Sequence, residues 1–264
     1  MKMSDHKNFR IVCIINFILI CVIAIIYFTV PGVVDKFILK PIPLILLILN
    51  VGYYFIIYKC HTYALLLQGG FNFCLIGDVL LMFYIPSIPK YNKPLLLISG
   101  GGSFFISRIL FSLMFLIYPY KDVSERIIKV SVLKSVLSGI VPMILSVCLI
   151  SYFSNIIPEK ILAILLSLYI CLMNLQLWLS LLRIKGFEEE SMISQIFGFV
   201  GTLFFNISDI LLFVNLFNNT VIIPDNITMS FYWLGMYILM ISVVRSSNFE
   251  REKKSMCSSE LYPY

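Results

Sequence analysis

Eight apolar segments, each about as long as a membrane-spanning helix requires, recur along this chain of 264 residues. Roughly 20 apolar residues carry an α-helix across a bilayer, and inside lipid the backbone polar groups must be paired within the segment. We therefore predict an all-α, polytopic membrane protein built as a bundle of eight transmembrane helices. The predicted spans are residues 11–30, 41–58, 62–85, 94–117, 133–156, 161–183, 193–217 and 227–246.

The composition agrees with this prediction, because 60% of the residues are hydrophobic and only 13% are charged. Soluble domains average about 25% charged residues. The first apolar segment is long enough to span a bilayer and has no small-residue cleavage site, so we interpret it as a helix and not a signal peptide. The expected organisation is a cytosolic N-terminus (1–10), a single membrane domain (11–246) and a cytosolic C-terminal tail (247–264).

The distribution of Lys and Arg predicts the orientation of the bundle. An even number of helices puts both termini on one side, and that side holds fourteen basic residues against five on the other. The positive-inside rule then makes both termini cytosolic. The net charge of +6 follows from this excess and does not indicate nucleic-acid binding. With two histidines and no paired cysteine motif, no metal or other cofactor is expected.

Two aspartates, Asp78 and Asp209, lie inside apolar segments, preceded by the small residues Gly77 and Ser208. A charge at bilayer depth costs about 2.5–3.5 kcal/mol on insertion scales, so such residues face the bundle interior and usually mark a functional site. Both helices are predicted to run in the same direction. Asp78 and Asp209 are then about seven and eight residues from the same end, which puts them at one level, roughly 10–12 Å deep.

Three functions are compatible with two level carboxyl groups. Two carboxyl groups sharing a low-dielectric site cannot both ionise at low cost, so one is expected to hold a proton while the other stays charged. Such a pair suits protonation of an acid-labile ether followed by attack of water. It also suits a proton-coupled transporter, and the similar sequences GDVLL and SDILL resemble the internal repeats of transporters. The third possibility is a structural pair with a buried cation such as Arg108.

Other polar or small residues in the helices have two interpretations each. Arg108 is a counter-ion or a snorkelling residue, and residue counting puts it nearer the cytosolic face than the aspartates. The run Gly100–Ser103 lies at the aspartate level, where it either lets helices approach or makes room for a substrate. Tyr232 lies at a similar depth. Five amides in the apolar segments are candidates for hydrogen bonds between helices: Asn72, Asn174, Gln176, Gln195 and Asn206.

Several of these pieces together resemble the lysoplasmalogenase, or YhhN-like, family of eight-helix membrane proteins. The similarity extends from about residue 40 to 245, with GDVLL and the block ending at Asp209 as its most specific parts. The matching pieces are Lys40–Pro43, Leu75–Leu81, Gly101–Phe105, Gly201–Asp209, Tyr232 and Ser242.

The resemblance implies hydrolysis of the vinyl-ether bond of a lysoplasmalogen, a lysophospholipid within the bilayer. The products are a fatty aldehyde and glycerophosphoethanolamine or glycerophosphocholine. It also implies location in the endoplasmic reticulum or a related membrane, and Asp78 and Asp209 match the two proposed catalytic acids of the family. The implied substrate-binding residues are Arg108, Gly101, Gly102, Ser103, Ser208 and Tyr232.

The chain departs from the family pattern at two positions. Arg108 stands where the family usually carries a histidine, and Met236 stands where it usually carries a glutamine. An arginine keeps the positive charge but cannot act as an acid or base at physiological pH. Met236 removes a hydrogen-bonding group. An alternative hypothesis is therefore a diverged member with altered headgroup preference, or a catalytically inactive lipid-binding protein.

Overall fold

The computed structural model describes residues 3–30, 38–58, 62–83, 93–117, 132–184, 191–218 and 221–260. Throughout these residues the regular secondary structure is α-helical, in eight helices, which confirms the predicted fold class. Seven are long and apolar enough to cross a membrane, and α3 is shorter but also apolar. The helices are α1 (Met3–Thr29), α3 (Ile42–Tyr58), α4 (Thr62–Met82), α5 (Lys93–Ile117), α7 (Val132–Ile156), α8 (Lys160–Arg183), α9 (Met192–Phe217) and α10 (Asp225–Glu260).

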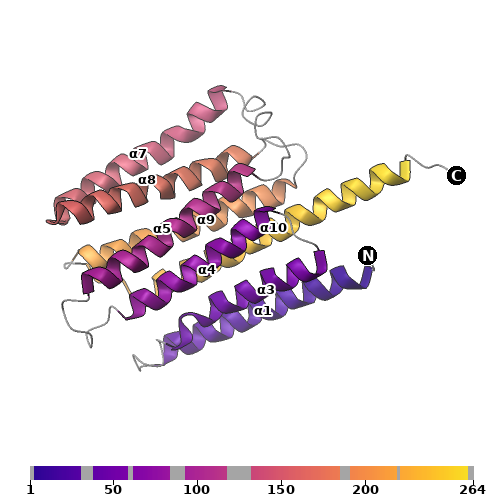
Figure 1. Ribbon diagram of the computed structural model, residues 1–264, viewed down its shortest axis with the longest axis horizontal. Helices are drawn as coiled ribbons and strands as arrows, with labels where there is room; N and C mark the ends of the chain where they lie inside the picture. Colours follow the sequence, from indigo (N-terminus) through magenta and orange to yellow (C-terminus); the bar gives the residue numbers. More distant parts are fainter. Residues whose placement is uncertain are drawn as a thin grey trace.

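The helix ends lie close to the predicted boundaries, except at the two ends of the chain. Helix α1 begins at Met3, and α10 continues through Glu260, well beyond the predicted membrane segment. Residues 247–260 contain neither glycine nor proline and are rich in Glu, Lys and Arg, which favour helix in water. The start of α1 and the end of α10 lie at the same end of the bundle (Figure 1). The basic connection 118–131, which contributes to the orientation prediction, lies outside the described residues.

The helices are arranged in three layers. Helices α7 and α8 lie on one side, α1 and α3 on the opposite side, and α4, α5, α9 and α10 between them (Figure 1). Only 11% of the spanning window of α7 and 17% of that of α1 are buried, against 61% for α10. The outer helices instead expose Ile, Leu, Val and Met side chains, as lipid-facing helices of a membrane protein do.

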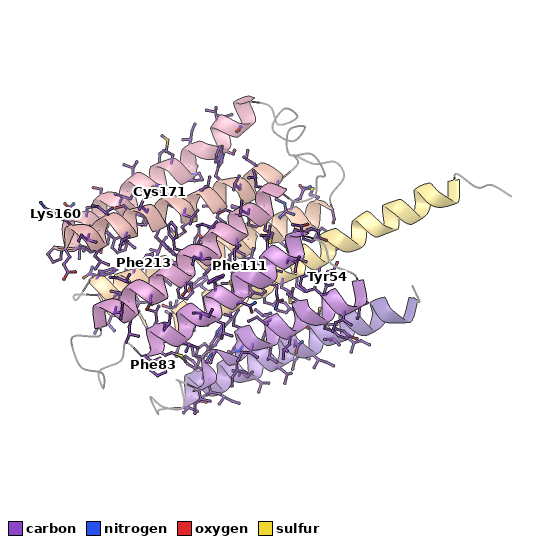
Figure 2. The ribbon with its side chains drawn as sticks, viewed as in Figure 1. Tyr54, Phe83, Phe111, Lys160, Cys171 and Phe213 are labelled. Carbon is purple, nitrogen blue, oxygen red and sulfur yellow. The ribbon has the colours of Figure 1, made fainter. Side chains whose placement is uncertain are left out.

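Glycines bring the central helices into close contact. A Cβ on Gly201 of α9 would lie 2.9 Å from the Gly235 carbonyl oxygen of α10, so the two backbones touch at this crossing. On α4, a Cβ at Gly70 would overlap the ring of Phe111. Phe111 and Tyr54 are both buried, and both are labelled in Figure 2. This tight packing determines which faces of α4, α5, α9 and α10 meet, and with them which polar side chains meet.

Candidate active site

Asp209 lies on α9 and is almost fully buried. Its Oδ2 atom accepts two hydrogen bonds, one from Arg108 Nη2 of α5 at 2.5 Å and one from the Tyr169 hydroxyl of α8. No described residue donates a hydrogen bond to Oδ1. Three helices thus converge on one carboxylate oxygen, while the other oxygen has no donor among the described residues.

The Arg108 guanidinium is completely buried, and each of its nitrogens is engaged. Nε donates to the Tyr169 hydroxyl at 3.3 Å, and Nη1 donates to Gln176 Oε1 at 2.8 Å and Asn206 Oδ1 at 2.7 Å. The group also lies over the ring of Phe205, 3.4 Å from its centroid. A buried cation needs extensive pairing of this kind, because desolvation is otherwise too costly. We call Asp209, Arg108, Tyr169, Gln176 and Asn206 the Asp209 cluster.

The expectation that Arg108 lies apart from the aspartates is wrong for its guanidinium. In a helix each Cα–Cβ bond tilts toward the N-terminus. Helices α5 and α9 run in opposite directions, as the fourth and seventh helices of an alternating bundle. The side chains of Arg108 and Asp209 therefore lean toward each other, and the length of the arginine closes the remaining gap. The counter-ion interpretation holds, with Asp209 as the partner.

Asp78 on α4 is also buried, but it has fewer partners. The Tyr232 hydroxyl of α10 donates to Oδ2 at 2.7 Å. Lys40, in the turn before α3, places its Nζ 3.7 Å from Oδ1, and the lysine side chain is 17% exposed. We call Asp78, Tyr232 and Lys40 the Asp78 cluster.

Aromatic rings link the two clusters. Phe205 lies under the Arg108 guanidinium and also packs against Tyr232, with ring centroids 5.8 Å apart. Phe104 of α5 packs edge-on to Tyr232 at 6.5 Å. A Cβ at Gly77 would lie only 2.7 Å from the Phe104 ring, so the glycine before Asp78 leaves room for Phe104. The rings place apolar groups beside the polar clusters, and charges interact more strongly in such low-dielectric surroundings than in water.

An apolar cavity of about 320 Å³ lies between α5, α8 and α9 and reaches the Asp209 cluster. Tyr169 and Asp209 supply its polar lining, and the remaining lining is leucine, isoleucine, phenylalanine and glycine. Phe213, labelled in Figure 2, is part of the wall. Leu81, one turn after Asp78 on α4, also lines it. The cavity extends from Asp209 toward the C-terminal end of α9, because Leu212 and Phe217, which follow Asp209 on this helix, also line it.

The glycine run on α5 has two roles. Gly100 packs against α4, since a Cβ there would lie 2.9 Å from Leu81. Gly101 and Gly102 line the cavity, and a Cβ at either would meet no atom within 4 Å. Close packing therefore explains Gly100 but not Gly101 or Gly102, whose missing side chains enlarge the cavity.

The other predicted site residues are placed as follows. Tyr232 contacts Asp78 directly, whereas the Ser103 hydroxyl donates to the Ser99 carbonyl one turn earlier on its own helix. The Ser208 hydroxyl donates to the Thr228 carbonyl and so joins α9 to α10. Ser103 and Ser208 thus bond to backbone carbonyls, and Met236 is fully buried.

Sequence analysis missed Tyr169 and assigned no role at the site to Lys40. Tyr169 and Gln176 are seven residues apart, so they lie on one face of α8, and this spacing was the signal that could have identified a polar face. Lys40 was noticed only as part of a motif. Among the described residues, no group of three His, Cys, Asp or Glu side chains could hold a metal ion.

Comparison of the chain with known proteins gives one match, to a family model. The model of a family described as the YhhN family matches residues 35–243, which include both clusters and every residue that lines the cavity. No curated protein and no solved structure matches the chain.

Proposed function

The chain belongs to the YhhN family, which includes lysoplasmalogenases, and we propose that it hydrolyses the vinyl-ether bond of a lysoplasmalogen within the membrane. The products are a fatty aldehyde and glycerophosphoethanolamine or glycerophosphocholine. The observation that carries the proposal is an apolar cavity that ends at a buried carboxylate, with a second buried carboxyl group one turn from its wall. Such a cavity suits a single hydrocarbon chain whose reactive bond lies at its polar end.

Vinyl-ether hydrolysis begins with transfer of a proton to the β-carbon of the double bond. The resulting oxocarbenium ion carries its positive charge on the α-carbon and the ether oxygen. Water adds to the α-carbon and loses a proton, and the hemiacetal so formed collapses to the aldehyde and the glycerol hydroxyl. The reaction needs one acid to donate the first proton and one carboxylate to stabilise the cation and accept the proton from water.

We assign the carboxylate role to Asp209. Arg108 is fully buried and forms an ion pair with this carboxylate, Nη2 to Oδ2, at 2.5 Å. Both protein donors bind Oδ2, so Oδ1 keeps its lone pairs for the cation or for water. Arg108 thus has a positioning role, although it cannot itself exchange protons at physiological pH.

We assign the acid role to Asp78. Its cation, Lys40, is partly exposed and at 3.7 Å lies beyond hydrogen-bonding distance, so the charge of Asp78 is balanced less tightly than that of Asp209. Lys40 can also turn toward water. Asp78 is therefore the carboxyl group better able to take up a proton between turnovers.

The test is aldehyde release from lysoplasmenylethanolamine by the purified protein in nanodiscs. Asp78→Asn and Asp209→Asn should each lower the rate about 10²–10⁴-fold, the usual contribution of an acid or base. Asp225→Asn, at an exposed aspartate in the first turn of α10, is the matched control and should leave the rate unchanged. Full activity in both of the first two variants would show that the assignment is wrong.

A second candidate is a lipid-binding protein without hydrolase activity. The observation that favours it is the pairing of Arg108 through four hydrogen bonds, which holds a permanent charge where the family pattern has a titratable group. This candidate predicts that the wild-type protein binds lysophospholipid but releases no aldehyde. The same preparation therefore distinguishes the two functions.

The proposal includes location in the endoplasmic reticulum or a related endomembrane, with both termini in the cytosol. Epitope tags at the two termini should be digested by protease added to intact microsomes. Protection of either tag would contradict the orientation.

A further inference from the structure

Lys40 is a cation beside the candidate site whose ammonium group forms an ion pair with Asp78 but no hydrogen bond within the part of the chain that the structure describes. Its Nζ is 3.7 Å from Asp78 Oδ1, outside the normal range for an N–H···O bond. No described residue accepts a hydrogen bond from it, although an ammonium group carries three donors. The side chain is 17% exposed, so the group remains accessible.

The position of Lys40 is unfavourable unless an anion is nearby. It lies two residues before Ile42, the first residue of α3, and a helix N-terminus carries partial positive charge. Asp78 compensates in part. Arg108, in contrast, uses four of its five N–H donors on partners within the Asp209 cluster, and its guanidinium is completely buried.

The cavity cannot hold both ends of a lysophospholipid. Its walls are almost entirely hydrocarbon, so a phosphate placed there would lose its hydration without gaining partners. If the hydrocarbon chain fills the cavity and the ether lies between the two carboxyl groups, the phosphate, three glycerol carbons further on, must leave on another side. Phe104 lines the cavity and packs against Tyr232 of the Asp78 cluster, so this cluster borders the cavity wall and supplies a cation, Lys40, that is paired only with Asp78 among the described residues.

We propose that the Lys40 ammonium binds the phosphate of a lysophospholipid whose hydrocarbon chain occupies the cavity. This inference rests on the proposed function, because it assumes that a single-chain ether lipid is the ligand. It makes Lys40 a residue that selects phosphate-bearing substrates over neutral ether lipids. The ammonium interacts with the phosphate by charge-assisted hydrogen bonds, which are stronger than neutral ones.

The test uses two ligands that cannot be hydrolysed as vinyl ethers. One is a 1-O-alkyl lysophosphatidylethanolamine, and the other is the matching 1-O-alkylglycerol, which lacks the phosphate. Equilibrium binding to the protein in nanodiscs is measured for wild type, Lys40→Gln and Lys40→Arg. Lys40→Gln should weaken phospholipid binding about tenfold or more and change alkylglycerol binding less than twofold, and Lys40→Arg should recover most of the loss.

Two further variants make the test specific. Lys160→Gln removes an exposed lysine at the start of α8, close to the cavity residue Leu162, and should have no effect. Asp78→Asn removes the anion that competes for Lys40, so phospholipid binding should tighten while alkylglycerol binding should not. Asn has nearly the same shape as Asp, and tighter phospholipid binding cannot result from misfolding. An increase in affinity for this variant therefore supports the role of Lys40 independently of the loss expected for Lys40→Gln.

The inference is overturned if Lys40→Gln weakens both ligands equally or neither, or if Lys160→Gln produces the selective loss instead. It is also overturned if the wild-type protein binds neither ligand. Because binding of an alkyl ether needs no catalysis, a wild-type protein that binds selectively but releases no aldehyde contradicts only the proposed hydrolysis.

Discussion

The Asp209 cluster and the Asp78 cluster contain the same types of group but differ in the burial and the hydrogen bonding of their cations. We call a cluster closed when its cation is buried and hydrogen-bonded, and open when it is not. Each has a buried aspartate, a tyrosine that donates to its Oδ2, and a cation. In the Asp209 cluster the cation is fully buried and makes four hydrogen bonds to side chains. In the Asp78 cluster the cation is partly exposed and makes no hydrogen bond to a described residue.

The difference shows how similar local sequences acquire different chemistry. GDVLL and SDILL are alike, but their aspartates take partners from different helices: α5 and α8 for Asp209, and α10 and the turn before α3 for Asp78. A closed cluster suits a group that keeps its charge, whereas an open one suits a group that exchanges a proton. Substitutions in the two clusters should therefore have unequal effects on stability and activity.

Arg108→Gln should destabilise the protein by about 3–5 kcal/mol, because it leaves the buried Asp209 charge without its partner. Thermal unfolding in detergent measures the loss. The double variant with Asp209→Asn should be more stable than the arginine variant alone, since it removes the uncompensated charge. A loss below about 1 kcal/mol for Arg108→Gln would mean that the Asp209 cluster is not closed as described.

Tyr169→Phe should destabilise the protein more than Tyr232→Phe. The Tyr169 hydroxyl both donates to Asp209 and accepts from Arg108, so its removal breaks two contacts with charged groups. The Tyr232 hydroxyl makes one contact, with Asp78. The expected losses are about 2–3 and roughly 1–2 kcal/mol, measured as shifts in the unfolding midpoint. Equal shifts would contradict the difference between the clusters.

Gly102→Leu should lower kcat/KM for aldehyde release about tenfold while folding is retained, because the new side chain projects into the cavity. Gly52→Leu on α3 is the matched control, since a Cβ there also meets no atom within 4 Å and the residue does not line the cavity. If both variants keep full activity, the substrate does not occupy this cavity. This prediction tests the Asp209 cluster, because Tyr169 and Asp209 line the cavity whereas no residue of the Asp78 cluster does.

Lys40→Gln should change the free energy of unfolding by less than about 1 kcal/mol, as expected for a partly exposed ion pair without hydrogen bonds. The measurement is the same unfolding assay as for Arg108→Gln, so the two cations are compared directly. A loss as large as that of the arginine variant would show that the Asp78 cluster is closed too.

The sequence alone was sufficient to predict the helices. Hydropathy predicted the spans to within a few residues, apart from the extended ends of α1 and α10, because a bilayer admits little besides paired helical backbone. It also singled out Asp78 and Asp209, since a charge inside an apolar segment is visible without any structure. The placement of both in the interior follows from the same energetic argument.

Tertiary packing decided which side chains meet. Residue counting placed Arg108 too far from Asp209, because counting along an axis ignores the tilt and length of side chains. Tyr169 was not predicted, because the role of a tyrosine in an apolar helix depends on which residues its hydroxyl contacts, and the sequence does not show these contacts.

The sequence by itself therefore determined a bundle of helices with two buried carboxyl groups. The faces that α9 and α10 present to each other are limited by the close contact of Gly201 with Gly235, and those of α4 and α5 by the contact of Gly70 with Phe111. These contacts turn one aspartate toward a buried arginine and the other toward a partly exposed lysine. Hydropathy limits how deep a residue lies in the membrane, but only packing between helices selects its neighbours.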